Sequence, residues 1–115
     1  FLTEKDWTLA ELMEQGEEIY NTRCAACHQM NGQGIPGFYP ALAGSDLVLN
    51  DKPKHIEILM EGVRGSQMQS FAEQLNEVEM ASVITFTRQA WGNDRAGDGE
   101  IVIPKDIVEY KQRDS

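Results

Sequence analysis

Two cysteines and a histidine stand close together in the stretch NTRCAACHQMNGQG, residues 21–34. Cys24 and Cys27 are three positions apart, and His28 follows directly. A Cys-x-x-Cys pair is typical of thiol redox sites, where it follows a strand and opens a helix. Cys and His side chains also bind zinc, which takes four ligands in structural sites. The complete string Cys-x-x-Cys-His is the attachment signature of c-type haem.

The rest of the chain favours haem attachment over the other two chemistries. Strand signal is almost absent, so the α/β setting of a thiol redox pair is not expected. Beyond the three motif residues the only other histidine is His55, which leaves zinc a single candidate for its fourth ligand. In a c-type haem two thioethers join vinyl-derived carbons, and the next imidazole lies below the iron. We therefore predict one haem c bound through Cys24 and Cys27, with His28 as an axial iron ligand.

The second axial position of such an iron needs another donor. The chain holds five methionines: Met13, Met30, Met60, Met68 and Met80. Three of them lie on apolar helical stripes, and Met30 is too near His28 to reach the opposite side of the ring. Met68 lies in the glycine-led loop RGSQMQSF, with Phe71 three residues later. We predict Met68 as the sixth ligand; the alternative is His55, expected to be solvated. A soft thioether favours ferrous iron and raises the reduction potential.

A helix before the motif must position it. Thr8 and Glu11 form the pattern of a capping box, which predicts a helix over residues 9–22. Its apolar positions recur at helical spacing: Leu9, Leu12, Met13, Ile19 and Tyr20. The cysteines then lie at the C-terminal end of this helix. Gly16 falls on the same stripe, which predicts the close approach of a crossing helix.

The crossing partner is predicted near the other end of the chain. Asn76 and Glu79 resemble a second cap, and apolar residues continue to about residue 91. We expect Val83 and Phe86 of this helix to meet Gly16 and Tyr20 on the first helix.

A third helical segment is predicted between these two. It opens at Pro53 and ends at glycines 62 and 65, with Ile56, Leu59, Met60 and Val63 on one face. Residues 29–50 and 64–75 are predicted loops. Loops of this length are uncommon in a compact domain unless they wrap something.

The C-terminal part is rich in turn residues from Gly92 through the stretch GNDRAGDGE. The one strand candidate is EIVI at residues 100–103, and Pro104 is expected to start a last short helix. We expect this tail to fold back on the domain.

Length and charge restrict the function. At 115 residues the chain is expected to form one domain. Acidic residues outnumber basic ones 19 to 10, for a net charge of -9, which argues against binding nucleic acid or anionic membranes and favours a basic partner protein. No apolar run approaches the roughly 20 residues of a membrane span. Because Phe1 is neither an initiator Met nor part of a signal peptide, we expect a mature or excised piece.

Taken together, these residues resemble a class I cytochrome c over about residues 9–91. The resemblance implies an all-α fold in which the first and last helices cross around a covalently bound haem, with Gly16 packed against Phe86. The stretches GEEIYNTRCAACHQMNGQGIPGFYPALAGSDLV, MQSF and ITFTRQAWGN are similar to the cytochrome c domain at the C-terminus of subunit II in bacterial caa-type haem-copper oxidases. That similarity extends through Trp91 and VIPKDIVEY, which implies a haem domain over 1–91 and a packed extension over 92–115.

The resemblance also implies roles around the haem. A proline carbonyl after the motif accepts the imidazole N–H of the axial histidine, and Pro40 matches this residue, with Pro36 as the other choice. Many class I cytochromes have Pro after the axial Met, where this chain has Gln69, as the oxidase-fused group commonly does. For Arg64 two alternatives stay open: a contact with a haem propionate, as the resemblance implies, or a side chain exposed to solvent.

The implied function is electron transfer by a single haem, without a catalytic activity of the domain's own. The expected donor is a soluble cytochrome or a quinol-oxidising complex, and the expected acceptor is the dinuclear copper domain of the oxidase. The domain would then lie on the periplasmic side of the bacterial inner membrane, tethered through its parent subunit. Two alternatives remain: a free periplasmic cytochrome, and a haem sensor or peroxidase-like enzyme with an open sixth position.

Overall fold

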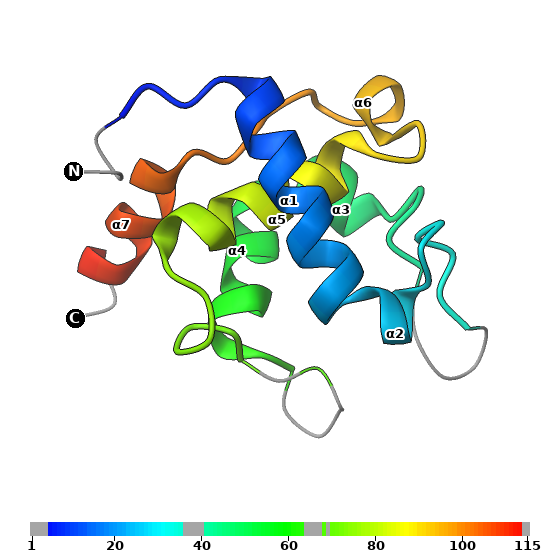
Figure 1. Ribbon diagram of the computed structural model, residues 1–115, viewed down its shortest axis with the longest axis horizontal. Coiled ribbons are helices and arrows are strands. Elements are labelled where there is room, and N and C mark those ends of the chain that lie inside the picture. The colour runs from blue at the N-terminus through cyan, green and yellow to red at the C-terminus, as the bar shows by residue number, and fades with distance from the viewer. Residues whose placement is uncertain (1–4, 36–40, 64–67, 69, 114–115) are drawn as a thin grey trace.

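The regular elements of the protein are helices. The computed structural model describes residues 5–35, 41–63, 68 and 70–113, with the backbone alone at positions 26 and 27, and no strand forms within these ranges. The helices, shown in Figure 1, are α1 (Leu9–Arg23), α2 (Ala25–His28), α3 (Asp46–Asn50), α4 (Lys52–Glu61), α5 (Glu77–Gln89), α6 (Asn93–Ala96) and α7 (Pro104–Arg113).

Both predicted capping boxes are present and fix where α1 and α5 begin. The backbone N–H of Glu11 donates to the Thr8 hydroxyl, while the Glu11 carboxylate accepts from the Thr8 N–H. Asn76 and Glu79 make the same reciprocal pair at the start of α5. Each box satisfies two backbone donors that have no partner inside the helix. The predicted helix starts are therefore confirmed.

Helices α1 and α5 cross at Gly16, as the sequence predicts (Figure 1). A Cβ atom placed on Gly16 would lie 2.1 Å from the Ser82 carbonyl oxygen and 2.7 Å from the Phe86 Cβ. One turn later the rings of Tyr20 and Phe86 pack with their centroids 5.5 Å apart. The expected contact through Phe86 is confirmed. At Gly16 itself the other neighbour is Ser82, and Val83 lies buried in the adjacent core.

Helix α4 packs beside α5 and contains a residue, His55, whose predicted exposure was wrong. It ends at Gly62, which has φ 75° and caps the helix as predicted. His55, expected to be solvated, is only 4% exposed. It precedes the buried Leu59 by four positions, so the two residues lie on one face of α4. Its Nε2 lies 3.5 Å from the Thr87 hydroxyl. Burial, together with the nearby positive charge of Arg88, lowers the pKa of His55 to about 3, so the ring is neutral.

Three short helices were not predicted, and two of them lie where a loop and a turn were expected. Helix α2 continues directly from α1, α3 lies within the predicted loop 29–50, and α6 lies within the predicted turn 92–100. Helices of four or five residues give little periodic signal, since one turn shows no repeat. The strand candidate at residues 100–103 has no regular secondary structure. The backbone of Val102 bonds to a side chain and not to a neighbouring strand. Its N–H donates to the Thr85 hydroxyl, and its carbonyl accepts from the same hydroxyl.

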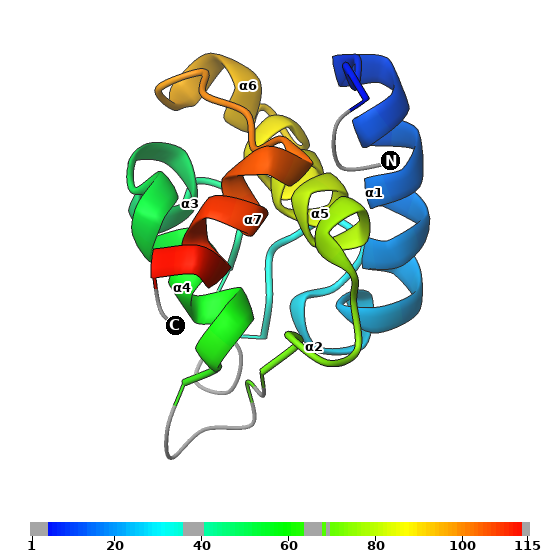
Figure 2. The ribbon, with the colours of Figure 1, turned by 90° about the vertical axis from the view of Figure 1, so that its left-hand side faces the viewer.

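The C-terminal part lies against α4 and α5 (Figure 2). The segment just before α7 is held by Arg88 of α5, whose guanidinium donates to the Glu100 carbonyl and forms an ion pair with Asp98. Helix α7 begins at Pro104, as predicted, and packs on α5. Its polar contacts reach both neighbouring helices: Lys52–Asp106, Glu77–Lys111 and Tyr110–Glu61.

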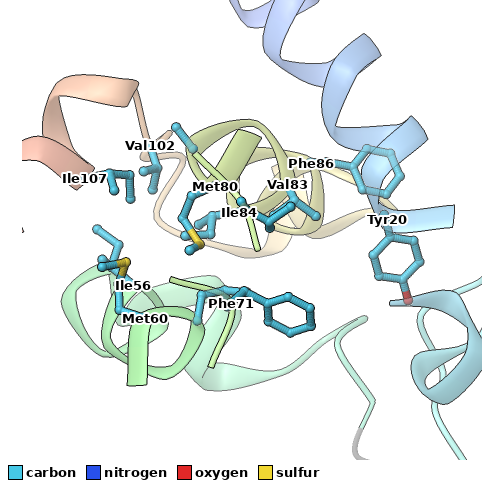
Figure 3. Close-up of a cluster of buried hydrophobic side chains, with 13 residues drawn as sticks. Tyr20, Ile56, Met60, Phe71, Met80, Val83, Ile84, Phe86, Val102 and Ile107 are labelled. Carbon is cyan, nitrogen blue, oxygen red and sulfur yellow. The ribbon is translucent and has the colours of Figure 1, made fainter. Parts of the chain in front are cut away.

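One apolar cluster joins these helices. Its buried members, drawn in Figure 3, come from α1, α4, α5, α7 and the segments 71–75 and 102. They are Tyr20, Ile56, Leu59, Met60, Phe71, Leu75, Met80, Ala81, Val83, Ile84, Phe86, Val102 and Ile107. Within the described ranges, none of the helices has the length and apolar character needed to cross a membrane.

The crossing predicts the effect of adding one methyl group. Gly16→Ala would raise stability by up to about 1 kcal/mol in an exposed helix, because Ala has the higher helix propensity. Here the new Cβ meets the Ser82 carbonyl and the Phe86 Cβ, so we expect the free energy of unfolding to fall by about 1–3 kcal/mol or more. Denaturant unfolding of the holoprotein measures this change in the free energy of unfolding. Glu17→Ala, at an exposed position of α1, is the control and should change stability by less than about 0.5 kcal/mol. A stabilised Gly16→Ala variant would contradict the close approach.

Candidate functional site

The Cys-x-x-Cys-His motif lies where α1 passes into α2. Cys24 closes α1 by donating its N–H to the Tyr20 carbonyl at 2.9 Å, and the His28 N–H donates to the Cys24 carbonyl at 3.0 Å. Positions 24, 27 and 28 are thus at i, i+3 and i+4 of one helical turn, the spacing that places residues on one face. Cys24 and His28 are both half-buried. The backbone therefore places positions 24, 27 and 28 at the junction of α1 and α2 with the spacing of one helix face.

Two side chains hold the backbone that follows His28. The Tyr20 hydroxyl donates to the Gln29 carbonyl at 2.6 Å, and the Trp91 indole N–H donates to the Met30 carbonyl at 3.0 Å. Burial raises the pKa of Tyr20, which keeps its hydroxyl protonated and able to donate. Both residues are apolar positions in the sequence pattern, so periodicity alone did not reveal these polar roles.

Trp91 also closes one side of an aromatic group. Its ring lies 5.1 Å from that of Tyr20 and 5.6 Å from that of Phe86, centroid to centroid, in edge-to-face contacts. A Cβ atom on Gly32 would lie 2.6 Å from the Trp91 ring, and Gly32 has φ 71°. Only glycine therefore allows this close approach, which connects the chain after the motif to the end of α5.

A second stretch of chain returns to the same place. The N–H groups of Leu42 and Ala43 both donate to the Gly32 carbonyl, at 2.7 and 3.0 Å. The Asn93 side chain, 1% exposed, accepts from the Gly44 N–H and donates to the Leu42 carbonyl. An Asn just after a predicted helix was the available sequence signal for this contact. Pro40 and Pro36 lie outside the described residues.

Met68 lies just beyond the C-terminal end of α4. It is half-buried and packs against the apolar cluster, as Cys24 also does. The Phe71 ring points from the α4 side of the cluster toward Tyr20 (Figure 3). Arg64 and Gln69 are not among the described residues.

The other candidate donors are placed elsewhere. Met60 and Met80 are buried in the core, Met13 packs against it, and Met30 is 68% exposed. His55 faces Thr87 between α4 and α5.

The charge of the site differs from that of the chain. Residues 24–45 contain no Asp, Glu, Lys or Arg. The acidic excess lies in part on α1, where Glu14, Glu17 and Glu18 are exposed.

The residues present fit a haem c. The described residues include the Cys24 thiol, which could form a thioether with a haem vinyl group, and two candidate iron donors, the His28 imidazole and the Met68 thioether; all three residues are half-buried. Imidazole together with a thioether sulfur is a donor pair that suits haem iron. The described residues contain no group of three or more His, Cys, Asp or Glu that would hold a metal ion.

Comparison with known proteins decides the family. Residues 11–86 match the family described as "Cytochrome C oxidase, cbb3-type, subunit III". The chain belongs to this cytochrome c family. It is 36% identical over 105 residues to cytochrome c-552 of Thermus thermophilus, which covers 79% of this chain and 70% of that protein.

Other relatives are much longer. The chain is 33% identical over 92 residues to the cytochrome c subunit of a quinone alcohol dehydrogenase from Gluconobacter oxydans, with 71% of this chain and 19% of that subunit covered. The chain thus spans about a fifth of that relative's length. Cytochrome cL from Hyphomicrobium denitrificans has the same fold, with a TM-score of 0.53, 24% identity, and 90% of this chain and 66% of that one covered.

Family membership and fold confirm three predictions. The protein is all-α with the class I cytochrome c fold, it carries a covalently bound haem c, and it is a single-haem electron-transfer domain. Storage of one electron is the chemistry that a bound haem supplies. The chain's own residues would hold and orient that group.

The hydroxyl of Tyr20 gives a test of how the motif is held. Tyr20→Phe keeps the ring contacts and leaves the Gln29 carbonyl with the Gly32 N–H, at 3.1 Å, as its remaining donor, so we expect the free energy of unfolding to fall by about 0.5–1.5 kcal/mol, the net value of one hydrogen bond. Tyr110→Phe is the matched control, because its hydroxyl donates to the exposed Glu61 carboxylate and should contribute less than about 0.5 kcal/mol. Denaturant unfolding of both holoproteins makes the comparison. Equal losses would show that the Gln29 contact has no special role.

Proposed function

We propose that Cys24 and Cys27 hold the haem through two thioether bonds and that His28 and Met68 ligate its iron. The support is the spacing of the motif on one helical turn and the half-buried position of Met68, which packs against the same apolar cluster as Cys24. The Pro40 carbonyl is proposed to accept the imidazole N–H of His28. Such a contact fixes the ring and raises its basicity.

We further propose that the domain is the C-terminal part of subunit II of a bacterial caa-type haem-copper oxidase. It would accept an electron from a soluble cytochrome or a quinol-oxidising complex and pass it to the dinuclear copper centre of its own subunit. The observation that carries this proposal is the sequence resemblance, which includes the WGN to VIPKDIVEY extension. Relatives in which this region is a small part of the chain support it, among them a cbb3-type cytochrome c oxidase subunit of Azospirillum brasilense, of which 30% is covered.

The extension over residues 92–115 is proposed as part of the same domain as residues 1–91. Support comes from its buried side chains, since Val102 and Ile107 are both fully buried in the core cluster. The domain would lie on the periplasmic side of the inner membrane. Tethering would replace diffusional encounter with an effective concentration on the order of mM for a short flexible linker.

A second candidate is a free, diffusible periplasmic cytochrome c. The relatives named cytochrome c-552 favour it, because the chain covers 70% and 73% of their lengths. For a free carrier the acidic face of α1, with Glu14, Glu17 and Glu18, suits a basic partner protein.

The gene upstream of Phe1 distinguishes the two candidates. We expect it to encode two membrane helices and a β domain with the Cys-rich ligands of a dinuclear copper centre. Stopped-flow oxidation of the intact subunit should then show electron transfer from haem to copper at a rate independent of protein concentration. A cleavable signal peptide that ends just before Phe1 would instead make this a free cytochrome and exclude the oxidase proposal.

Met68→Ala tests the iron ligands. We expect the reduction potential to fall by about 0.1 V or more, since axial ligands set haem potentials over a range of about 0.8 V. The haem should remain covalently attached, and the weak far-red band of a ferric Met–iron bond should disappear. Met30→Ala, at an exposed methionine, is the control and should keep the band. If Met30→Ala or Met60→Ala abolished the band and Met68→Ala did not, the assignment would be wrong.

A further inference from the structure

The end of α4 has backbone carbonyls that no residue of the helix can satisfy. The last carbonyls of any α-helix lack an intrahelical partner. In α4 the Gly62 N–H closes the Ile58 carbonyl at 2.7 Å, and the Phe71 N–H donates to the Leu59 carbonyl at 2.8 Å. The Ser70 hydroxyl donates to the Met60 carbonyl at 2.5 Å. The chain that follows Met68 is therefore attached to the end of α4.

The backbone of Met68 itself is also bonded to the chain just after α4. Its carbonyl accepts from the N–H of Val63, directly after the helix cap, at 2.8 Å. Backbone contacts thus fix position 68 at one end and position 71 at the other. Between them Ser70 adds a contact that depends on its side chain.

The Ser70 hydroxyl makes two hydrogen bonds, one as a donor and one as an acceptor. It donates to the Met60 carbonyl and accepts from the Ala72 N–H at 3.2 Å. A hydroxyl can do both at once, whereas an alanine methyl can do neither. The Met60 side chain is buried in the core, so the carbonyl that Ser70 reaches belongs to a fixed part of α4. Ser70 itself is exposed, and its hydroxyl is therefore not needed to fill the core.

We propose that Ser70 is a positioning residue for the sixth iron ligand, acting through its hydrogen bond to the end of α4. This proposal rests on Met68 as that ligand. The bond holds the backbone two residues after Met68 close to α4, which favours the conformation that presents the thioether. Without it, the segment between positions 68 and 71 samples more conformations, and the ligand leaves the iron more readily.

Imidazole competition measures how readily Met68 leaves. Imidazole binds ferric haem where an axial ligand departs, so its apparent affinity reports the population of the open state. Ser70→Ala should raise the imidazole affinity of the ferric holoprotein about two- to tenfold, the range expected for one net hydrogen bond. Loss of the far-red Met–iron band during the titration gives the readout. Ser70→Thr keeps a hydroxyl and should stay near the parent value.

Thr22→Val is the matched control. The Thr22 hydroxyl also donates to a helix carbonyl, that of Glu18, on an exposed face of α1. Its loss should leave imidazole affinity unchanged. Denaturant unfolding of the same variants separates the roles, because a merely structural Ser70 would lower stability without changing imidazole affinity.

The outcomes distinguish this proposal from the ligand assignment on which it rests. An unchanged imidazole affinity in Ser70→Ala, or an equal rise in Thr22→Val, overturns the positioning role. A far-red band that survives in Met68→Ala overturns the assignment of Met68 itself. Loss of the band in Met68→Ala, a rise in Ser70→Ala and recovery in Ser70→Thr support both.

Discussion

The close approach of α1 and α5 at Gly16 is the contact on which the rest of the structure depends. With 2.1 Å between a hypothetical Cβ and the Ser82 carbonyl, no other residue fits at this position without moving a backbone. The crossing fixes the direction of α1 and hence the place where its last turn ends. Because the motif follows that turn directly, the orientation of Cys24 and His28 is set by a contact two to three turns away along α1.

Aromatic side chains extend this constraint from the crossing to the motif. Phe86 lies at the crossing, Tyr20 packs on it, and Trp91 contacts both. The polar atoms of Tyr20 and Trp91 then hold the two carbonyls that follow His28. The same side chains thus combine apolar packing with hydrogen bonding, as buried Tyr and Trp commonly do.

Features that depend on nearby residues could be predicted from the sequence. The capping boxes at Thr8 and Asn76, the glycine in the apolar stripe and the haem signature each need only a few neighbouring positions. Short helices such as α2 and α3 were missed because a single turn has no periodicity to detect. His55 was misplaced because its burial depends on α5, which lies some thirty residues away in sequence.

The polar contacts of the candidate site were the hardest to predict. A Tyr and a Trp at apolar positions fit the pattern equally well with or without a hydrogen-bond partner. The partners of Tyr20 and Trp91 are backbone carbonyls, which every residue possesses, so no residue type marks them. Ser70 is a similar case, because a serine in a loop has no distinctive pattern until the end of α4 is placed beside it.

The crossing also gives the chain a particular topology. The Ser82 hydroxyl donates to the Gln15 side chain across 67 positions of sequence, so the helix pair closes a large loop. Both His28 and Met68 lie inside it, 40 positions apart (68 − 28 = 40). Closing a loop costs entropy that grows only slowly with its length. With Met68 as the proposed iron ligand, its departure would relax the inner part of this loop and leave the helix pair closed. Two separable levels of opening would follow from the proposed ligation, a local one within the loop and a global one at the crossing.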